Sequence, residues 1–177
     1  MLSGGLTLLI SEADLKSAVA ELARQIDRDY AGVDLVLVCV LKGAAIFASD
    51  LLRKLHTGVR SVEYVRASSY GSGTEPSGSV HISGTLDAQR ITGQHVLIVD
   101  DIADTGHTCA GVSDFLQEMN PASRRYCTLL DKPSRREVSV QYDYVGFTIP
   151  NHFVVGYGMD LDERYRGLPA VYYFPDA

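Results

Sequence analysis

The sequence predicts an α/β fold with a mainly parallel, twisted sheet flanked by helices. Two apolar, β-branched runs, 33–41 (VDLVLVCVL) and 96–99 (VLIV), are typical of strands buried on both faces. Segments with apolar residues at helical spacing alternate with such runs, as in a parallel sheet with helical crossovers. A length of 177 residues favours a single domain spanning 1–177.

The first elements alternate between helix and strand. Ser11, followed by Asp14, predicts a helix N-cap, and the helix is expected to end at Gly32. Its apolar face carries Leu15, Val19, Leu22 and Ile26. After the strand 33–41 and the turn 42–44, a second amphipathic helix carries Ile46, Leu51, Leu52 and Leu55. Residues 59–65 are predicted to form the next strand.

Residues 68–83 (SSYGSGTEPSGSVHIS) differ sharply in composition from their surroundings. Gly, Ser, Thr and Pro dominate, which predicts a long mobile loop rather than a core element. Such a loop is either a linker or a lid. Neither flanking half is long enough for a comfortable separate domain, which favours a lid.

The second half repeats the alternation. The strand 96–99 is followed by a turn at Gly106 and a helix from about 108 to 119. Further strands are predicted at 126–130, 143–149 and 153–158, and no internal repeat is found. In such a fold we expect ligands to bind beyond the carboxyl ends of the parallel strands.

Composition narrows the classes of partner and compartment. The net charge is 16 − 22 = −6, which disfavours nucleic-acid binding, because the short arginine pairs form no basic face. No apolar stretch is long enough to span a bilayer, and the start lacks a basic signal-peptide region. Cys39, Cys109 and Cys127 form no CxxC motif, so we expect a reduced, cytoplasmic protein without a membrane partner.

The segment 95–108 (HVLIVDDIADTGHT) predicts a phosphate site. A strand here turns into a helix, and successive backbone N–H groups at such a turn form an anion cradle. Thr105 and Thr108 add hydroxyl donors, and Gly106 permits close approach of the backbone. Neither a Walker loop nor a GxGxxG motif is present, which excludes those two nucleotide-binding patterns.

The acidic residues beside this turn need a different explanation. Asp100 and Asp101 would repel a phosphate, so we expect them to face ribose hydroxyls or Mg²⁺. An acidic N-cap before a Gly-containing turn would explain Asp104 and Gly106, but not two further aspartates at a strand end. Phosphate, ribose and magnesium together describe an activated sugar phosphate.

These motifs resemble the phosphoribosyl-pyrophosphate (PRPP) site of type I phosphoribosyltransferases, and the rest resembles their hypoxanthine-guanine (6-oxopurine) branch. LKGA (41–44) is similar to the pyrophosphate loop of that branch, and SSYG (68–71) to the start of its lid. LLDKPSR (129–135) is similar to its base-binding lysine segment, and 143–166 to its purine pocket. The resemblance implies that fold, with a small hood formed by terminal segments.

The resemblance also implies an activity and a set of roles. The enzyme would transfer the 5-phosphoribosyl group from PRPP to N9 of hypoxanthine or guanine, releasing pyrophosphate, in purine salvage. The PRPP and phosphate contacts would come from Asp100, Asp101, Ile102, Ala103, Asp104, Thr105, Gly106, His107 and Thr108. Asp104 would be the catalytic acid-base group near purine N7. His107 is expected to act through its backbone, with its imidazole exposed.

The remaining implied roles lie elsewhere in the chain. Pyrophosphate would contact Lys42 and Gly43, after a peptide bond that can be cis, and Arg166 from the other side. The purine would contact Lys132, Phe153, Val154 and Asp160, and the lid would close through Ser69 and Tyr70. Mg²⁺ would be held by Asp160, Asp100 and Asp101, although many relatives have Glu at the first position of the acidic pair, so Asp100 reaches less far. A homodimer or homotetramer is the expected assembly.

Three alternatives stay open at this point. Lys132 and Phe153 argue against a uracil enzyme but separate guanine from xanthine poorly. A regulator that uses a PRPP fold to bind RNA or DNA is disfavoured by the net charge and by the presence of Asp104 and Arg166.

Overall fold

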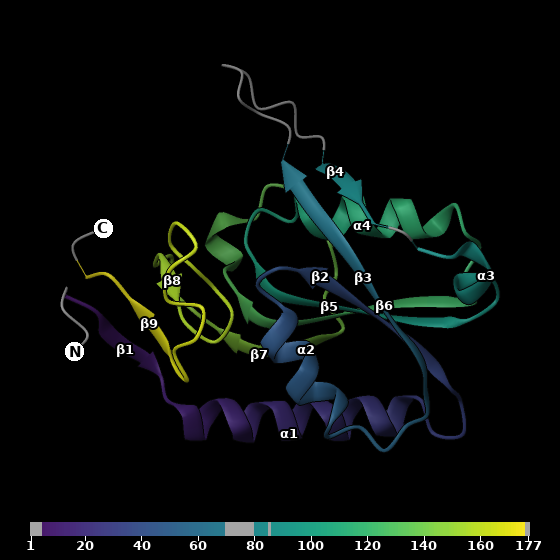
Figure 1. Ribbon diagram of the computed structural model, residues 1–177, viewed down its shortest axis with the longest axis horizontal. Helices are drawn as coiled ribbons and strands as arrows, with labels where there is room; N and C mark the ends of the chain where they lie inside the picture. The colour runs from purple at the N-terminus through teal and green to yellow at the C-terminus, as the bar shows by residue number, and fades with distance from the viewer. Residues whose placement is uncertain (1–4, 70–79, 85, 176–177) are drawn as a thin grey trace.

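The computed structural model describes residues 5–69, 80–84 and 86–175. Figure 1 shows a central sheet between two layers of helices, with a small second sheet beside it that contains both terminal strands. The predicted α/β class with a terminal hood is therefore confirmed. In chain order the elements are β1 (Thr7–Ile10), α1 (Glu12–Asp29), β2 (Leu35–Leu41), α2 (Ala45–Leu52), β3 (Val59–Ser69), β4 (Val80–Ser83), α3 (Ala88–Ile91), β5 (His95–Ala103), α4 (His107–Gln117), β6 (Ser123–Asp131), a 3₁₀ turn (Pro133–Arg135), β7 (Tyr144–Thr148), β8 (Val154–Val155) and β9 (Val171–Tyr173).

The main sheet has the order β4-β3-β2-β5-β6-β7. All neighbouring pairs are parallel except β3 and β4, which are antiparallel. The chain runs from β2 to β3 on one side and later places β5 on the other side of β2. Loops leaving β2 and β5 therefore diverge, and this topological switch point creates a crevice at the carboxyl ends of the two strands.

Two apolar clusters fill the space between the sheet and its helices. Alternate residues of β2 and β5 face α1 and α2, while the others face α4. Such side-chain alternation explains why the two central strands are apolar throughout. All three cysteines are buried and free in this core. Burial raises the pKa of the Cys39 thiol to about 12, so the thiol stays protonated and packs as an apolar group.

The predicted caps and helices agree with the structure, with one difference in α2. Ser11 is the N-cap of α1, and its hydroxyl accepts a hydrogen bond from the backbone N–H of Asp14. In α2 the buried face is formed by Phe47, Ala48 and Leu51, whereas Ile46 is 36% exposed. The expected face is thus rotated, because the large Phe47 ring takes the inward position.

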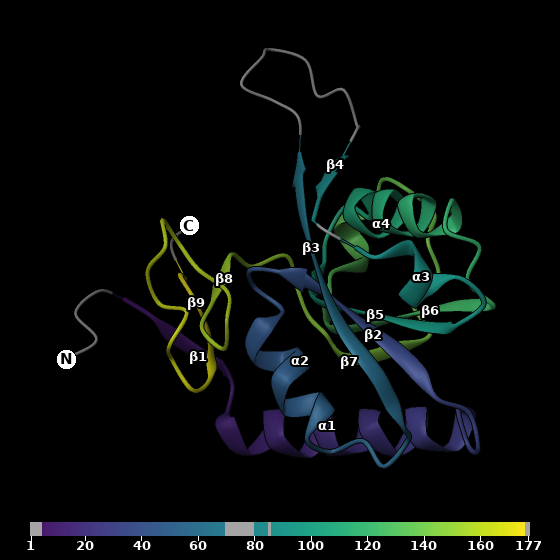
Figure 2. The same cartoon turned by 45° about the vertical axis from the view of Figure 1, so that its right-hand side comes forward.

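The segment 68–83 is only partly a loop. Residues 68–69 extend β3, and β4 pairs antiparallel with them, with Ser69 opposite Val80. Figure 2 shows these two strands projecting beyond the edge of the sheet. The prediction of an irregular loop over 68–83 is therefore wrong at both ends, where backbone pairing overrides a polar composition. Residues 70–79 lie outside the described residues.

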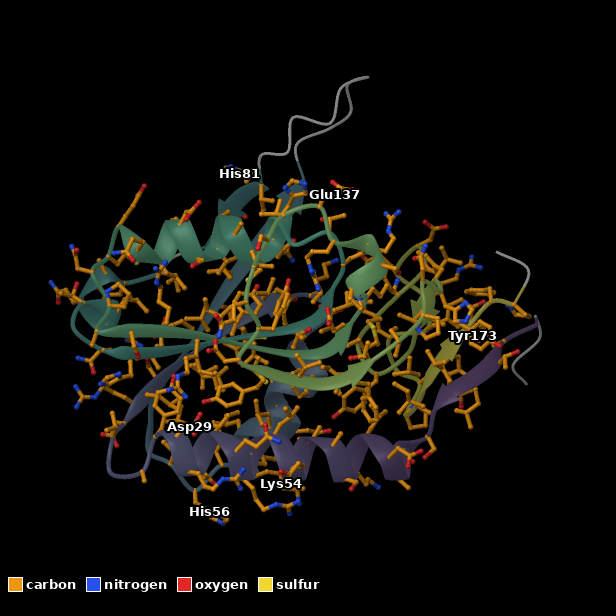
Figure 3. The ribbon with its side chains drawn as sticks, turned by 180° about the vertical axis from the view of Figure 1, so that it is seen from behind. Asp29, Lys54, His56, His81, Glu137 and Tyr173 are labelled. Carbon is orange, nitrogen blue, oxygen red and sulfur yellow. The ribbon has the colours of Figure 1, made fainter. Side chains whose placement is uncertain are left out.

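The hood is the three-stranded sheet β1-β9-β8. Its strands come from the two ends of the described chain, as Figure 3 illustrates with Tyr173 on β9. The predicted strand 153–158 is reduced to Val154–Val155, and it belongs to the hood instead of the main sheet. None of the helices in the described part of the chain is long and apolar enough to cross a membrane.

Candidate active site

A cavity of about 550 Å³ opens at the switch point, between the carboxyl ends of the parallel strands and the loops of the hood. Its walls come from β2, β3, β4, β5, β6 and from the segment 153–166 that follows β7. It contains ten of the residues predicted for the site: Lys42, Gly43, Asp101, Ile102, Asp104, Lys132, Phe153, Val154, Asp160 and Arg166. Residues distant in sequence thus meet where an α/β sheet binds its ligands.

The acidic pair at the end of β5 divides between the two faces of the sheet. Successive side chains of a strand point to opposite sides, so Asp101 lines the cavity while Asp100 faces α4. Asp100 is only 5% exposed, and its Oδ2 accepts a hydrogen bond of 3.3 Å from the hydroxyl of Tyr126. Burial, together with the neighbouring charge of Asp101, raises the pKa of Asp100 well above its usual range. The prediction that Asp100 contacts ribose or Mg²⁺ is wrong in this geometry.

Asp101 lies against the turn that follows β2. The peptide bond between Leu41 and Lys42 is cis, as the resemblance implied. A Cβ on Gly43 would lie 1.9 Å from Oδ2 of Asp101, so a larger residue at this position would displace the carboxylate or the turn. The carbonyl oxygen of Gly43 would lie 2.1 Å from a Cβ on Gly158, which shows that the hood loop presses on the same turn. Burial raises the pKa of Asp101 too.

Lys132 and Asp104 mark the side of the cavity next to β6. The side chain of Lys132 is almost entirely buried, and desolvation lowers the pKa of its ammonium group. Its Nζ lies 3.9 Å from Oδ2 of Asp104, whose Oδ1 accepts a 3.1 Å hydrogen bond from Nε of Arg135. Two cations therefore face the Asp104 carboxylate. The Phe153 side chain, 48% exposed, lines the same cavity from the hood.

A hairpin of the hood supplies Arg166, the cation on the side of the cavity opposite Lys132. The backbone N–H of Gly158 donates to the carbonyl of Arg166, and Leu161 and Arg164 each donate to the carbonyl of the other, which fixes the hairpin 156–168. Nη1 of Arg166 donates to the carbonyl of Gly158 at 2.8 Å, and Nη2 lies 2.8 Å from Oδ1 of Asp160. The other oxygen of Asp160 accepts a 2.8 Å bond from the backbone N–H of Glu163.

The turn predicted to hold phosphate leads from β5 into α4. Gly106 has φ +95° and begins the helix, whose first turn starts at His107. The segment after the 3₁₀ turn packs on it, because the carbonyl of Thr105 accepts hydrogen bonds from the backbone N–H groups of Glu137 and Val138. The imidazole of His107 is partly exposed, and its Nε2 lies 3.1 Å from Oε2 of Glu137. Ala103 and residues 105–108 do not line the main cavity.

The lid prediction falls at the boundary of the described residues. Tyr70 lies outside them, and of Ser69 only the backbone pairing with Val80 is described. The structure adds to the cavity wall side chains to which the sequence analysis gave no individual role, namely Leu41, Arg66, Ala67, Ser83, Met159 and Glu163. Arg66 could have been found, since it directly follows the predicted strand 59–65. No sequence signal placed Glu163.

Comparisons with known proteins agree on one family. The sequence model of the phosphoribosyl transferase domain matches residues 11–162. A hypoxanthine phosphoribosyltransferase of Escherichia coli is 47% identical over 166 residues, covering 93% of this chain and 92% of the relative. One of Salmonella typhimurium is 48% identical over 166 residues, with the same two shares. The crystal structure of a hypoxanthine-guanine phosphoribosyltransferase of Bacillus anthracis matches with a TM-score of 0.89 at 44% identity, covering 94% of this chain and 97% of that one.

Proposed function

This chain belongs to the phosphoribosyltransferase family, and on that basis we propose that it transfers the 5-phosphoribosyl group of PRPP to N9 of hypoxanthine or guanine, releasing pyrophosphate. One observation carries the proposal. A single cavity at the switch point holds a buried lysine, Lys132, after β6 and a pair of cations, Lys42 and Arg166, at β2 and the hood. Because β5 separates β2 from β6, the two sides are about 10 Å apart, which leaves room for a ribose between base and pyrophosphate.

The purine would bind at Lys132. Its ammonium can donate to the exocyclic O6 of hypoxanthine or guanine, whereas adenine presents an amino group that leaves this buried donor unpaired. The ring of Phe153 can stack on the purine, a contact worth about 1–3 kcal/mol in other base-binding sites. The backbone of Val154, also in the cavity wall, would pair with the purine edge.

Asp104 would act on the charge that develops on the purine. In the family that the chain resembles, this carboxylate lies near N7 of the purine. The side chains of Lys132 and Arg135 both face it at 3.9 Å and 3.1 Å. We propose that Asp104 stabilises positive charge on the purine as the bond to C1 of the ribose breaks or forms.

The sugar phosphate would occupy the middle of the cavity. Asp101 can accept hydrogen bonds from the ribose hydroxyls, and Lys42 and Arg166 can bind the oxygens of pyrophosphate. The 5-phosphate would bind the turn of residues 104–108, where backbone N–H groups and the positive end of the α4 dipole favour an anion. Closure of the segment 68–83 would exclude water from the reacting carbon.

The cavity also fits Mg²⁺, which prefers carboxylate and phosphate oxygens. Asp160 and Asp101 present such oxygens in the wall, and the carboxylate of Asp160 is fixed by Arg166 and a backbone N–H group. When bound, the ion would neutralise charge on the leaving pyrophosphate. Asp100 does not fit this role, because it faces α4.

A substitution at Lys132 tests the purine assignment. In Lys132→Ala we expect kcat/KM for hypoxanthine to fall about 10-fold to 150-fold, the value of a hydrogen bond to a charged donor, with KM for PRPP nearly unchanged. Lys54→Ala, which removes an exposed lysine far from the cavity, is the matched control. Steady-state formation of the nucleotide measures both constants. Undiminished use of hypoxanthine by Lys132→Ala would show that the base binds elsewhere.

Further parts of the proposal concern the whole molecule. We propose that residues 1–177 act as one domain and assemble as a homodimer or homotetramer, which light scattering after gel filtration would measure. A cytoplasmic location is supported by the three free, buried cysteines.

A further inference from the structure

The carboxylate of Glu163 bridges the two cations assigned to pyrophosphate. Its Oε1 lies 2.6 Å from Nζ of Lys42, which follows β2. Its Oε2 lies 3.2 Å from Nη2 and 3.3 Å from Nε of Arg166 in the hood. One acidic side chain thus holds cations from two separate parts of the fold.

The backbone presents this side chain in an unusual way. Leu161 and Arg164 are bonded to each other in both directions, and the two residues between them, Asp162 and Glu163, have φ of 51° and 61°. This is a two-residue hairpin turn with positive φ at both positions, where Asn-Gly is the preferred sequence. Glutamate at the glycine position is strained, and strain of this kind persists where surrounding contacts fix it.

The acidic side chains that line the cavity compete with a bound anion for the cations of the same wall. Among the described residues of its wall there are four cations, Lys42, Arg66, Lys132 and Arg166, and four acids, Asp101, Asp104, Asp160 and Glu163. Pyrophosphate brings several negative charges into this balanced wall. Since Glu163 is 62% exposed at the side chain, it can swing into solvent, whereas Asp101 is only partly exposed and Asp160 is held by both Arg166 and a backbone N–H group.

We propose that Glu163 is an internal competitor for pyrophosphate, a positioning residue that bridges Lys42 and Arg166 and gives up both when a pyrophosphate group binds them. The inference rests on the proposed function, which identifies pyrophosphate as the ligand of these two cations. A merely structural role would predict weaker pyrophosphate binding when the carboxylate is removed, whereas a competitor predicts the opposite. Removing the carboxylate frees Lys42 and takes away one of the two carboxylates that hold Arg166, which tightens pyrophosphate binding, and its presence favours release of the product.

The test compares two isosteric substitutions in the same turn. Glu163→Gln removes the bridging charge and keeps the backbone N–H that binds Asp160. Asp162→Asn, the matched control, removes one negative charge from the neighbouring residue, which has no ion pair with any described residue. Titration calorimetry with inorganic pyrophosphate and Mg²⁺ at fixed ionic strength measures affinity, and thermal melting confirms that each variant folds.

We expect the Kd for pyrophosphate to fall about threefold to thirtyfold in Glu163→Gln, the range for two partly exposed ion pairs, and less than twofold in Asp162→Asn. Equal tightening in both variants would overturn the inference, because it would show an effect of net charge alone. Unchanged or weaker binding of pyrophosphate by Glu163→Gln, or no measurable binding to the wild type or to this variant, would also overturn the inference.

A parallel assay separates this inference from the proposed function. If the wild type forms nucleotide from hypoxanthine and PRPP but Glu163→Gln binds pyrophosphate no more tightly, only the role of Glu163 is wrong. If the wild type forms no nucleotide, the proposed function is wrong, and the pyrophosphate titrations still decide whether Glu163 competes for Lys42 and Arg166.

Discussion

The contact between Gly43 and Asp101 gives a prediction whose size follows from geometry. In Gly43→Ala the new methyl group would lie 1.9 Å from Oδ2 and 2.5 Å from Cγ of Asp101. Ordinary contact begins at 3.4 Å, so one partner must move by about 1.5 Å, the difference of the two distances. The movement of both partners is restricted, because Asp101 is half-buried and Gly158 presses on the carbonyl of Gly43 from the other side.

Overpacking of this kind costs about 1–3 kcal/mol. In a chain of this length each 1 kcal/mol lowers the melting temperature by about 2–4 °C, so we expect Gly43→Ala to melt about 2–12 °C below the wild type. Because the displaced groups are those proposed to bind ribose and pyrophosphate, KM for PRPP should rise about tenfold or more.

The control is Gly167→Ala, since a Cβ on Gly167 would meet no atom within 4 Å. It should melt within about 2 °C of the wild type, as surface substitutions change stability by up to about 0.5 kcal/mol. Calorimetric melting and steady-state kinetics measure the two effects. A Gly43→Ala protein that melts with the wild type and keeps its KM for PRPP would refute the close packing of this turn on Asp101.

Three further substitutions test separate parts of the account. Asp104→Asn should keep PRPP binding in calorimetry but lose about 10²-fold to 10⁴-fold in kcat, and unchanged turnover would remove Asp104 from the mechanism. Asp100→Asn should raise the melting temperature at pH 7, because burial penalises the ionised carboxylate that the unfolded chain adopts at this pH, and Asn keeps an acceptor for Tyr126. KM for PRPP should stay within about twofold. A large rise in KM would restore Asp100 to the ligand site. The third concerns Asp27, whose pKa is raised by burial but lowered overall by hydrogen bonds from Thr57 and His56. A carboxyl group whose pKa is lowered by folding stabilises the fold at pH values above its ordinary pKa of 3.8, and this stabilisation is lost as the pH falls through the pKa of the folded state. Asp27→Asn should therefore melt about 2–4 °C below the wild type at pH 7, and at the same temperature as the wild type near pH 2. A difference independent of pH would contradict the role of its charge.

Much of the fold could be predicted because local pattern and burial agree. The apolar run 33–41 and the cap at Ser11 correspond closely to β2 and to the start of α1. The hood was expected only from the resemblance, since β1, β8 and β9 are two to four residues long and carry no clear alternation. The segment 68–83 misled composition-based reasoning, because antiparallel pairing stabilises its polar ends as strands.

The residues of the site also divide into those that could be predicted from the sequence and those that could not. Motifs placed Lys42, Lys132 and Arg166 in one cavity, where strand order brings them together. The direction of Asp100 could have been deduced from alternation along β5, had the strand been extended past residue 99. Glu163 could not have been found, because its role depends on a turn with positive φ and on partners 121 and 3 residues away.

Base selectivity tests the central claim most directly. Initial rates would be measured with hypoxanthine, guanine, xanthine, adenine and uracil, each with PRPP, and with Mg²⁺ present or withheld. The account predicts that hypoxanthine and guanine are converted to their nucleotides only with Mg²⁺, and that adenine and uracil react at least about a hundredfold more slowly. Adenine has no carbonyl oxygen to accept a hydrogen bond from the buried ammonium of Lys132, and uracil lacks the imidazole ring that carries N7 and N9. Adenine or uracil used as fast as hypoxanthine would contradict it.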